Sequence, residues 1–363
     1  SGIVMTRFLV LAASLLALSA YSDEGMWTLD NFPSRTVERE YGARIDAEWL
    51  TRLRSATVRL DGGCSGSFIS PGGLVLTNNH CVWGCVRNLS SADENLSEQG
   101  FLAAGRGEER TCPGMRLSSL AETEEVTEEV TAAVEGLDQA AANEARKAKL
   151  SALEKQCEAD SDGELACESV NLYRGGQYFL YKYRRYEDVR LVFAPELAIA
   201  AFGGDLDNFN FPRWALDMAM LRAYEDGKPA AVEQFLPWRA AGPDDGEAVF
   251  VVGHPGTTQR LMTVAQLEHR RASLLPMYLM VFSELRGRLK AWGRTGDEPA
   301  RIVQQRILGI ENTIKVLQNQ QVSLMDETQM DRKREQEAEL RKAVDRKRSL
   351  RQSQRFLQAY CGK

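Results

Sequence analysis

A chain of 363 residues that is 44% hydrophobic and 26% charged has the composition of a globular protein, with length enough for about two domains. A formal net charge of -6 leaves no broad cationic surface for phosphate groups, which excludes nucleic acid as an expected partner. The acidic balance is more typical of a surface that keeps a protein soluble.

The first residues have the features of an export signal. Arg7 is followed by an apolar run from Phe8 to Leu18, which is too short for a membrane span, and then by small residues. We therefore expect residues 1–22 to be a signal peptide and the mature protein to be periplasmic or secreted. No stable membrane span is expected after cleavage of the signal.

Export changes what seven cysteines mean, because thiols outside the cytoplasm are usually paired. Cys64 and Cys81 lie at the two ends of one strand-rich stretch, and Cys157 and Cys167 flank a turn. Cys85 and Cys112 form the next candidate pair, and this leaves Cys361 without a partner. The candidates for disulfide bonds are Cys64, Cys81, Cys85, Cys112, Cys157 and Cys167.

The chain alternates between strand and helix patterns. Residues 55–77 alternate apolar and polar side chains between glycine turns, which predicts short antiparallel strands in the wall of a barrel. A charged stretch near 121–157 has high helix propensity and predicts a helical insertion. Strand patterns return at 178–194, 214–224 and 247–253, and helical periodicity dominates after residue 260.

His80 is one of three histidines and directly precedes Cys81. The arrangement is similar to that of chymotrypsin-like peptidases, in which a catalytic histidine precedes a cysteine bridged to the preceding strand. Such a disulfide would fix the backbone that carries a general base. The alternatives are a structural histidine or a metal site with Cys81 and Cys85, but that site lacks a tetrahedral ligand set and needs thiolates where oxidation is expected. We expect His80 to be the base, with no metal and no cofactor.

A histidine base needs a carboxylate to orient it. Asp217 opens an otherwise apolar strand, where a carboxylate is costly to bury unless it is paired, so it is the expected orienting group. Asp205 and Asp207 follow two glycines and fit turn capping better. Ser65 and Ser67 belong to the strand that leads to His80. No Gly-x-Ser-Gly stretch lies elsewhere in the sequence, so the nucleophile is expected to be missing.

Four stretches in order resemble the bacterial dipeptidyl-peptidases of the dipeptidyl-peptidase 7 and 11 family, which are serine exopeptidases of the chymotrypsin-like clan. The stretches are DEGMWTLDNFP, GGCSGSFISPGGLVLTNNHC, FGGDLDNFNFPRWALDM and GHPGTTQR, and they span residues 23–260. The resemblance implies a β + α fold in which a chymotrypsin-like (trypsin-like) β-barrel is the first half of a double β-barrel, followed by an inserted α-helical cap domain. Residues 23–260 would be the first barrel, and 261–363 an apparently truncated cap.

The resemblance also implies a substrate and its binding residues. Peptides with free N-termini are the expected partners, and a homodimer is possible by the same resemblance. Asn208 and Phe209 occupy positions that help to hold the substrate N-terminus, although an aromatic ring with a polar nitrogen is common at the latter position. Asn312 resembles an asparagine of the helical domain that reaches the same amine, with an ordinary helix surface as the alternative. Asn79 stands where the family usually has a second histidine.

The function that follows is a serine-type dipeptidyl-peptidase, an aminopeptidase that releases dipeptides from free N-termini. The chain carries the histidine and aspartate of the triad without the serine, so we expect these 363 residues alone to be inactive. The alternative is a non-catalytic peptide-binding or scaffold remnant of such a peptidase. His254 lies among turn residues and is expected to be structural. His269 lies on a charged helix and is expected to be solvated.

Overall fold

The computed structural model describes residues 26–91, 93–173, 175–201, 214–255 and 262–346. Within these ranges the chain forms two compact units: residues 26–51 together with Pro243–Val249, and the remainder from Arg52 onward. The expected signal peptide (residues 1–22) and Cys361 lie outside the described residues.

The smaller unit is mainly helical. It contains a 3-10 turn η1 (Leu29–Asn31), α2 (Ser34–Tyr41) and the start of α3 (Ala47–Ala56). The α2 helix ends at Gly42, which has a φ of 67° and donates its N–H to the carbonyl of Glu38 at 3.0 Å. The carboxylate of Asp46 accepts the N–H of Trp49 at 2.8 Å, which satisfies one of the free donors at the start of α3.

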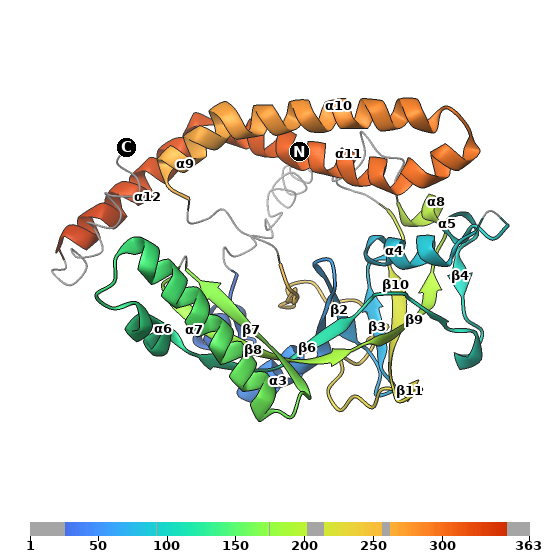
Figure 1. Cartoon of the computed structure of the whole chain (residues 1–363), viewed down its shortest axis with the longest axis horizontal. Helices are drawn as coiled ribbons and strands as arrows, with labels where there is room; N and C mark the ends of the chain where they lie inside the picture. Colours follow the sequence, from blue (N-terminus) through green and yellow to red (C-terminus); the bar gives the residue numbers. More distant parts are fainter. Residues whose placement is uncertain (1–25, 92, 174, 202–213, 256–261, 347–363) are drawn as a thin grey trace, which may run out of the picture. The chain divides into compact units, whose positions relative to one another are not determined.

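The larger unit is built on one antiparallel sheet of eleven strands (Figure 1). The strand order is β4-β9-β10-β3-β2-β1-β6-β8-β7, with β11 beside β10 and β5 beside β9. The strands are β1 (Thr57–Leu60), β2 (Cys64–Phe68), β3 (Leu74–Thr77), β4 (Phe101–Leu102), β5 (Arg110–Thr111), β6 (Leu117–Glu125), β7 (Leu165–Leu172), β8 (Gln177–Tyr186), β9 (Asp188–Ala194), β10 (Ala219–Glu225) and β11 (Lys228–Pro229).

Glycine allows the sharp connection between β2 and β3. Gly73 has a φ of 66°, and a Cβ at this position would lie 2.8 Å from the carbonyl oxygen of Ala223. Any other residue would be strained in this conformation and would also collide with the neighbouring strand. The short hairpin that results delivers β3 directly to the segment containing His80.

Helices connect the strands of the larger unit and continue to the end of the described chain. They are α4 (Asn79–Leu89), α5 (Leu96–Gln99), a 3-10 turn η2 (Arg106–Glu108), α6 (Thr127–Val134), α7 (Gln139–Asp160), α8 (Leu197–Ala200), α9 (Val264–His269), a π-helical turn η3 (Arg270–Leu274), α10 (Leu275–Gly293), α11 (Asp297–Met325) and α12 (Glu327–Arg346). None of the helices within the described ranges has the length and apolar character needed to cross a membrane.

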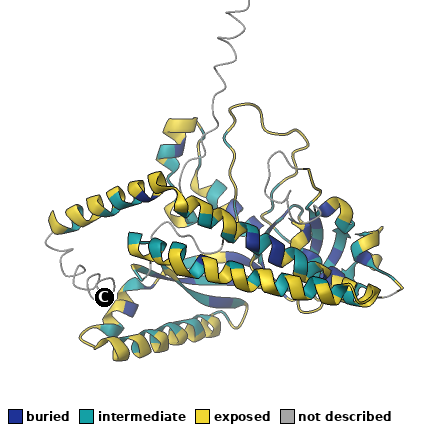
Figure 2. Ribbon diagram, turned by 90° about the horizontal axis from the view of Figure 1, so that it is seen from above, coloured by how far each residue is buried: buried dark blue, intermediate teal, exposed yellow. Residues whose placement is uncertain are grey.

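Apolar side chains from the strands form the main core. Its members include Val58, Phe68, Val75, Leu191 and Leu221, each at most 1% exposed. Figure 2 shows buried residues concentrated in the strands, whereas α7 has no buried residue and α10 has only Leu275. The sheet therefore supplies most of the hydrophobic stabilisation of this unit.

The coarse fold predicted from the sequence is confirmed as a mixed structure with a large antiparallel sheet, and residues 264–346 are almost entirely helical. The helical insertion expected near 121–157 begins later than predicted. Residues 121–125 belong to β6, where Glu122 and Glu124 contact Lys182 of β8 at 3.3 and 3.0 Å. Cross-strand charge pairing outweighs their helix propensity.

The strand predicted at 247–253 is wrong. These residues are irregular, and the side chains of Val249 and Val251 are exposed. An apolar run forms a strand only where its backbone N–H and C=O groups find a neighbouring strand, and within the described ranges this run has none.

Leu221 provides a test of the core. Leu221→Ala should lower the free energy of unfolding by about 2–5 kcal/mol, because it leaves a cavity between β3 and β9 where the side chain is fully buried. Leu102→Ala removes the same atoms at a site that is 71% exposed and is the matched control, expected to change stability by less than about 0.5 kcal/mol. Urea unfolding measures both, and equal effects would contradict this assignment of the core.

Candidate active site

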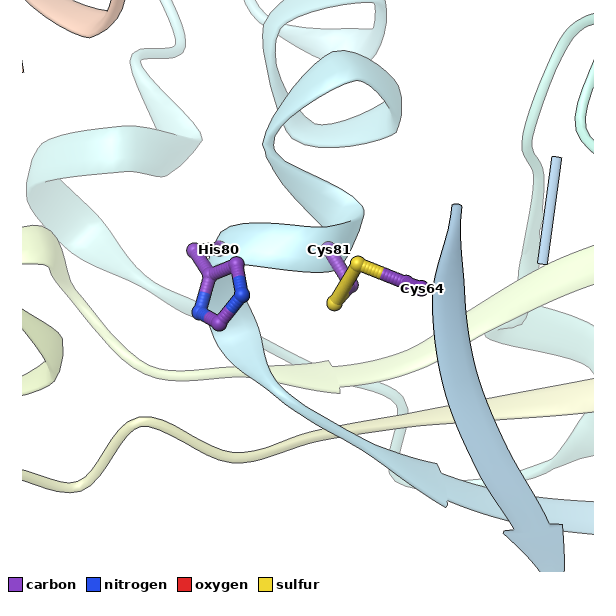
Figure 3. A group of neighbouring side chains, drawn as sticks. All are labelled: Cys64, His80 and Cys81. Carbon is purple, nitrogen blue, oxygen red and sulfur yellow. A yellow bond between two sulfur atoms is a disulfide. The ribbon is translucent and has the colours of Figure 1, made fainter. Parts of the chain in front are cut away.

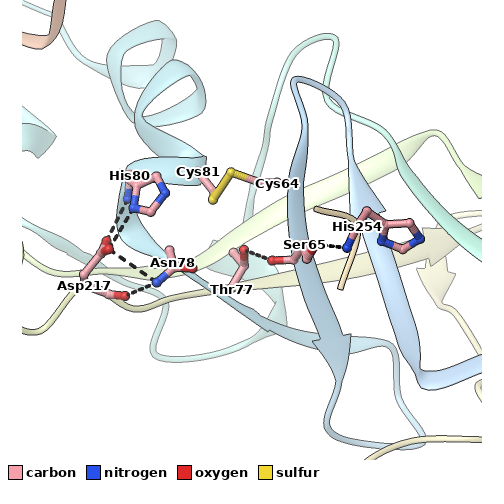
Figure 4. Close-up of a disulfide and its surroundings, with 8 residues drawn as sticks. All are labelled: Cys64, Ser65, Thr77, Asn78, His80, Cys81, Asp217 and His254. Carbon is pink, nitrogen blue, oxygen red and sulfur yellow. Dashed lines mark hydrogen bonds and ion pairs between the residues drawn. A yellow bond between two sulfur atoms is a disulfide. The ribbon is translucent and has the colours of Figure 1, made fainter. Parts of the chain in front are cut away.

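The register of two strands brings His80 and Asp217 together. In the antiparallel pair of β3 and β10, Thr77 lies opposite Ala219. His80 follows the end of β3, and Asp217 precedes the start of β10. Because these strands are antiparallel, the two residues lie at the same end of the strand pair. The structure thus brings together the two residues singled out from the sequence as base and orienting group (Figure 4).

The contact between them has two parts. Nδ1 of His80 lies 2.7 Å from Oδ2 of Asp217, and the backbone N–H of His80 donates to Oδ1 of the same carboxylate at 3.0 Å. Because an ionised carboxylate only accepts hydrogen bonds, the ring proton of neutral His80 belongs on Nδ1. This arrangement leaves Nε2 with a lone pair that can take up a proton.

The surroundings of the Asp217 carboxylate favour its ionised form. Burial alone would raise the pKa of Asp217, but the hydrogen bonds from the ring and the backbone N–H of His80 outweigh it and lower the pKa below its usual value. The same backbone N–H lies in the first turn of α4, where free donors and the helix dipole favour a negative charge. Asp217 therefore stays ionised at neutral pH, as an orienting group must.

The His80 ring is open to solvent on one side. Its side chain is 51% exposed, compared with 31% for Asp217. The Trp83 ring, one turn further along α4, makes an edge contact with the imidazole at 6.3 Å between ring centroids. Sequence reasoning missed Trp83, although its spacing of three residues from His80 on a helix was a usable signal.

Among the described residues there are three disulfides, and they are the three pairs predicted from the sequence. Cys64–Cys81 joins β2 to α4 immediately after His80 (Figure 4). Cys85–Cys112 ties the next turn of α4 to the residue that follows β5, and Cys157–Cys167 joins α7 to β7. Two covalent links therefore hold the helix that carries His80.

Figure 3 shows the one group, within the described ranges, whose ligand atoms lie close enough to share a metal ion. Its members are Cys64, His80 and Cys81, with ligand atoms within 4.8 Å of one another. Both sulfur atoms belong to a disulfide, however, and a cysteine binds metal as a thiolate. The oxidised group is a poor ligand set, and the expectation of no metal stays a prediction.

The structure describes only one of the three residues that were predicted to bind the substrate N-terminus. Asn208 and Phe209, like Asp205 and Asp207, lie outside the described residues. Asn312 is half-buried in α11, one residue after the buried Glu311. Its proposed contact with a substrate amine stays a prediction.

Ser65 and His254 form a second polar contact beside the site. The hydroxyl of Ser65 accepts the backbone N–H of His254 at 2.6 Å, and Figure 4 shows this pair on the far side of Thr77 from His80. This contact fits the structural roles expected for both residues.

Nδ1 of His254 is buried with no hydrogen-bond partner among the residues described. Burial and the nearby Arg59 guanidinium lower the pKa of His254 to about 4, against an opposing effect of Glu168.

A neutral, buried His254 makes stability depend on pH. Above about pH 6.5 both folded and unfolded forms hold this ring neutral, whereas between about 6.5 and 4 only the unfolded form takes up a proton. Acidification should therefore weaken the fold. His254→Gln should remove up to about 3 kcal/mol of that pH dependence in urea unfolding compared at pH 8 and about pH 4.

The matched control is His269→Gln, a change at an exposed position of α9. Equal pH profiles for His254→Gln and the unaltered protein would contradict the assignment of a neutral buried ring.

A histidine with a carboxylate on Nδ1 and a free Nε2 is the acid–base pair that peptidases use. Residues 22–360 match the sequence profile of the Peptidase S46 family, so the chain belongs to this family, and the resemblance drawn from four sequence stretches is confirmed.

Relatives and solved structures agree with this assignment. The Asp/Glu-specific dipeptidyl-peptidase of Shewanella putrefaciens is 37% identical over 287 residues, which cover 74% of this chain and 39% of that protein. Dipeptidyl-peptidase 7 of Phocaeicola vulgatus is 28% identical over 92% of this chain and 50% of that protein. The crystal structure of Porphyromonas endodontalis DPP11 with the dipeptide Arg-Asp has the same fold, with a TM-score of 0.81 at 22% identity, covering 92% of this chain and 51% of that one. The chain spans about half of these proteins or less.

Proposed function

We propose that this chain is the part of a serine dipeptidyl-peptidase that supplies the general base and its orienting carboxylate. The observation that carries the proposal is the 2.7 Å contact between Nδ1 of His80 and Oδ2 of Asp217, made in a chain of the Peptidase S46 family. The serine belongs to a segment of the whole protein outside these 363 residues. In this proposal residues 23–260 contribute the first of two β-barrels and residues 261–363 contribute to a helical cap.

The proposed chemistry follows from the free Nε2 of His80. Nε2 takes the proton of the serine hydroxyl while the oxygen attacks the carbonyl carbon of the second substrate residue. The imidazolium, stabilised by Asp217, then gives that proton to the leaving amine. The dipeptide remains as an ester on the serine until water, activated by the same histidine, releases it. Backbone N–H groups near the serine would stabilise the oxyanion.

The substrate proposal is a peptide with a free N-terminus. It is supported by relatives named dipeptidyl-peptidases and by the DPP11 structure with a bound dipeptide. In this proposal Asn208, Phe209 and Asn312 hold the protonated amine at a fixed distance from the reacting carbonyl. We further propose a periplasmic or secreted enzyme, in keeping with the three disulfides, that requires no cofactor and forms a homodimer.

The test uses the whole protein encoded by the reading frame that contains these residues. We expect it to release dipeptides from peptides with a free N-terminus and to leave N-acetylated peptides intact. Substrates with acidic and with apolar penultimate residues are compared. Asp217→Asn should lower kcat by about 10⁴-fold, because the imidazole then takes the wrong tautomer.

Two results would overturn the proposal. One is dipeptide release by the 363-residue chain alone that is abolished by His80→Ala, because the chain would then contain its own nucleophile. The other is full activity of the whole protein carrying His80→Ala. His269→Ala is the matched control and should keep the activity of the unaltered enzyme.

A further inference from the structure

The side chain of Asn78 contacts Asp217 at two points. Its Nδ2 donates to the backbone oxygen of Asp217 at 2.9 Å and to the carboxylate Oδ2 at 3.3 Å (Figure 4). Both neighbours are oxygen atoms that only accept hydrogen bonds, so the amide NH₂ group must face them. The Oδ2 atom is the same one that accepts the ring N–H of His80.

Asn78 does not have the usual role of an asparagine at the start of a helix. Such a residue normally accepts a backbone N–H of the first turn through its side-chain oxygen, as Asn95 does from Ser97 at 3.2 Å at the start of α5. Asn78 makes no such bond, and Asp217 accepts the N–H of His80 in its place. The Asn78 amide is thereby left to hold the carboxylate.

We propose that Asn78 is a positioning residue that fixes the rotation of the Asp217 carboxylate and so keeps the His80 proton on Nδ1. Its relevance to catalysis rests on the proposed function, but the positioning itself is a property of this chain.

The reason is that the terminal torsion of an aspartate is broad, so the carboxylate can turn unless both oxygens are held. The N–H of His80 holds Oδ1. The Asn78 amide bridges Oδ2 and the backbone oxygen of the same residue, which ties the carboxylate to its own main chain. Asp217 is 31% exposed, so water can compete for Oδ2 once this tie is removed.

The experiment measures the tautomer of His80 directly in the 363-residue chain. The chain has three histidines, so ¹⁵N-histidine labelling gives three sets of ring signals, and His80→Gln assigns the relevant one. At alkaline pH the nitrogen shifts should show Nδ1–H in the unaltered chain. In Asn78→Ala the ratio of Nδ1–H to Nε2–H should fall by about fivefold, the order expected for the loss of one hydrogen bond.

The matched control is Asn95→Ala, which makes the same change at the start of another helix. It should leave the His80 tautomer unchanged. An unchanged unfolding temperature shows that Asn78→Ala is folded. The proposal is overturned if this folded variant keeps the tautomer ratio of the unaltered chain. It is also overturned if Asn95→Ala shifts the ratio equally.

Two further measurements decide the matter if Asn78→Ala does not fold. Asn78→Asp keeps the side-chain shape, lacks the donor, and should lower the same ratio. In the unaltered chain, the Asn78 amide signals should shift as Asp217 is protonated, and no shift would refute the contact. No serine or substrate takes part in these measurements, so a failed peptidase assay would leave their outcome unaffected.

Discussion

The alignment of β10 with β3 is the constraint on which the candidate site depends. Antiparallel pairing places Thr77 opposite Ala219, and the residues just beyond this pair are His80 and Asp217. Because successive side chains of a strand point to opposite faces, a slip of one residue would send the carboxylate to the other side of the sheet. The register is set by apolar side chains buried on both strands, including Val75 and Leu221. The hydrophobic core thus determines the distance between the His80 ring and the Asp217 carboxylate.

One carboxylate links secondary structure with chemistry. Asp217 accepts a backbone N–H in the first turn of α4 and also the ring proton of the histidine in that turn. The first contact fixes where the helix begins, and the second fixes how its side chain is oriented. One carboxylate therefore both caps the start of the helix and orients the ring.

Much of this site could be predicted from the sequence, because its strongest signals are local. A histidine next to a bridged cysteine and an aspartate at the start of an apolar strand each stand out along the chain, and the structure brings them into contact. Asn78 could not be predicted, since an asparagine before a helix is normally its cap, and only the three-dimensional structure shows its amide turned toward Asp217. The strand predicted at 247–253 failed because pairing depends on a partner that a local pattern does not reveal.

The covalent attachment of α4 has a consequence for where the protein can work. Cys81 adjoins His80, and Cys85 lies one turn further along, so two oxidised links restrain the segment that presents the imidazole. A reductant strong enough to open both links would leave the histidine dependent on strand register and hydrogen bonds alone. The redox potential of the surroundings therefore influences how firmly the His80 segment is held, without any change in sequence.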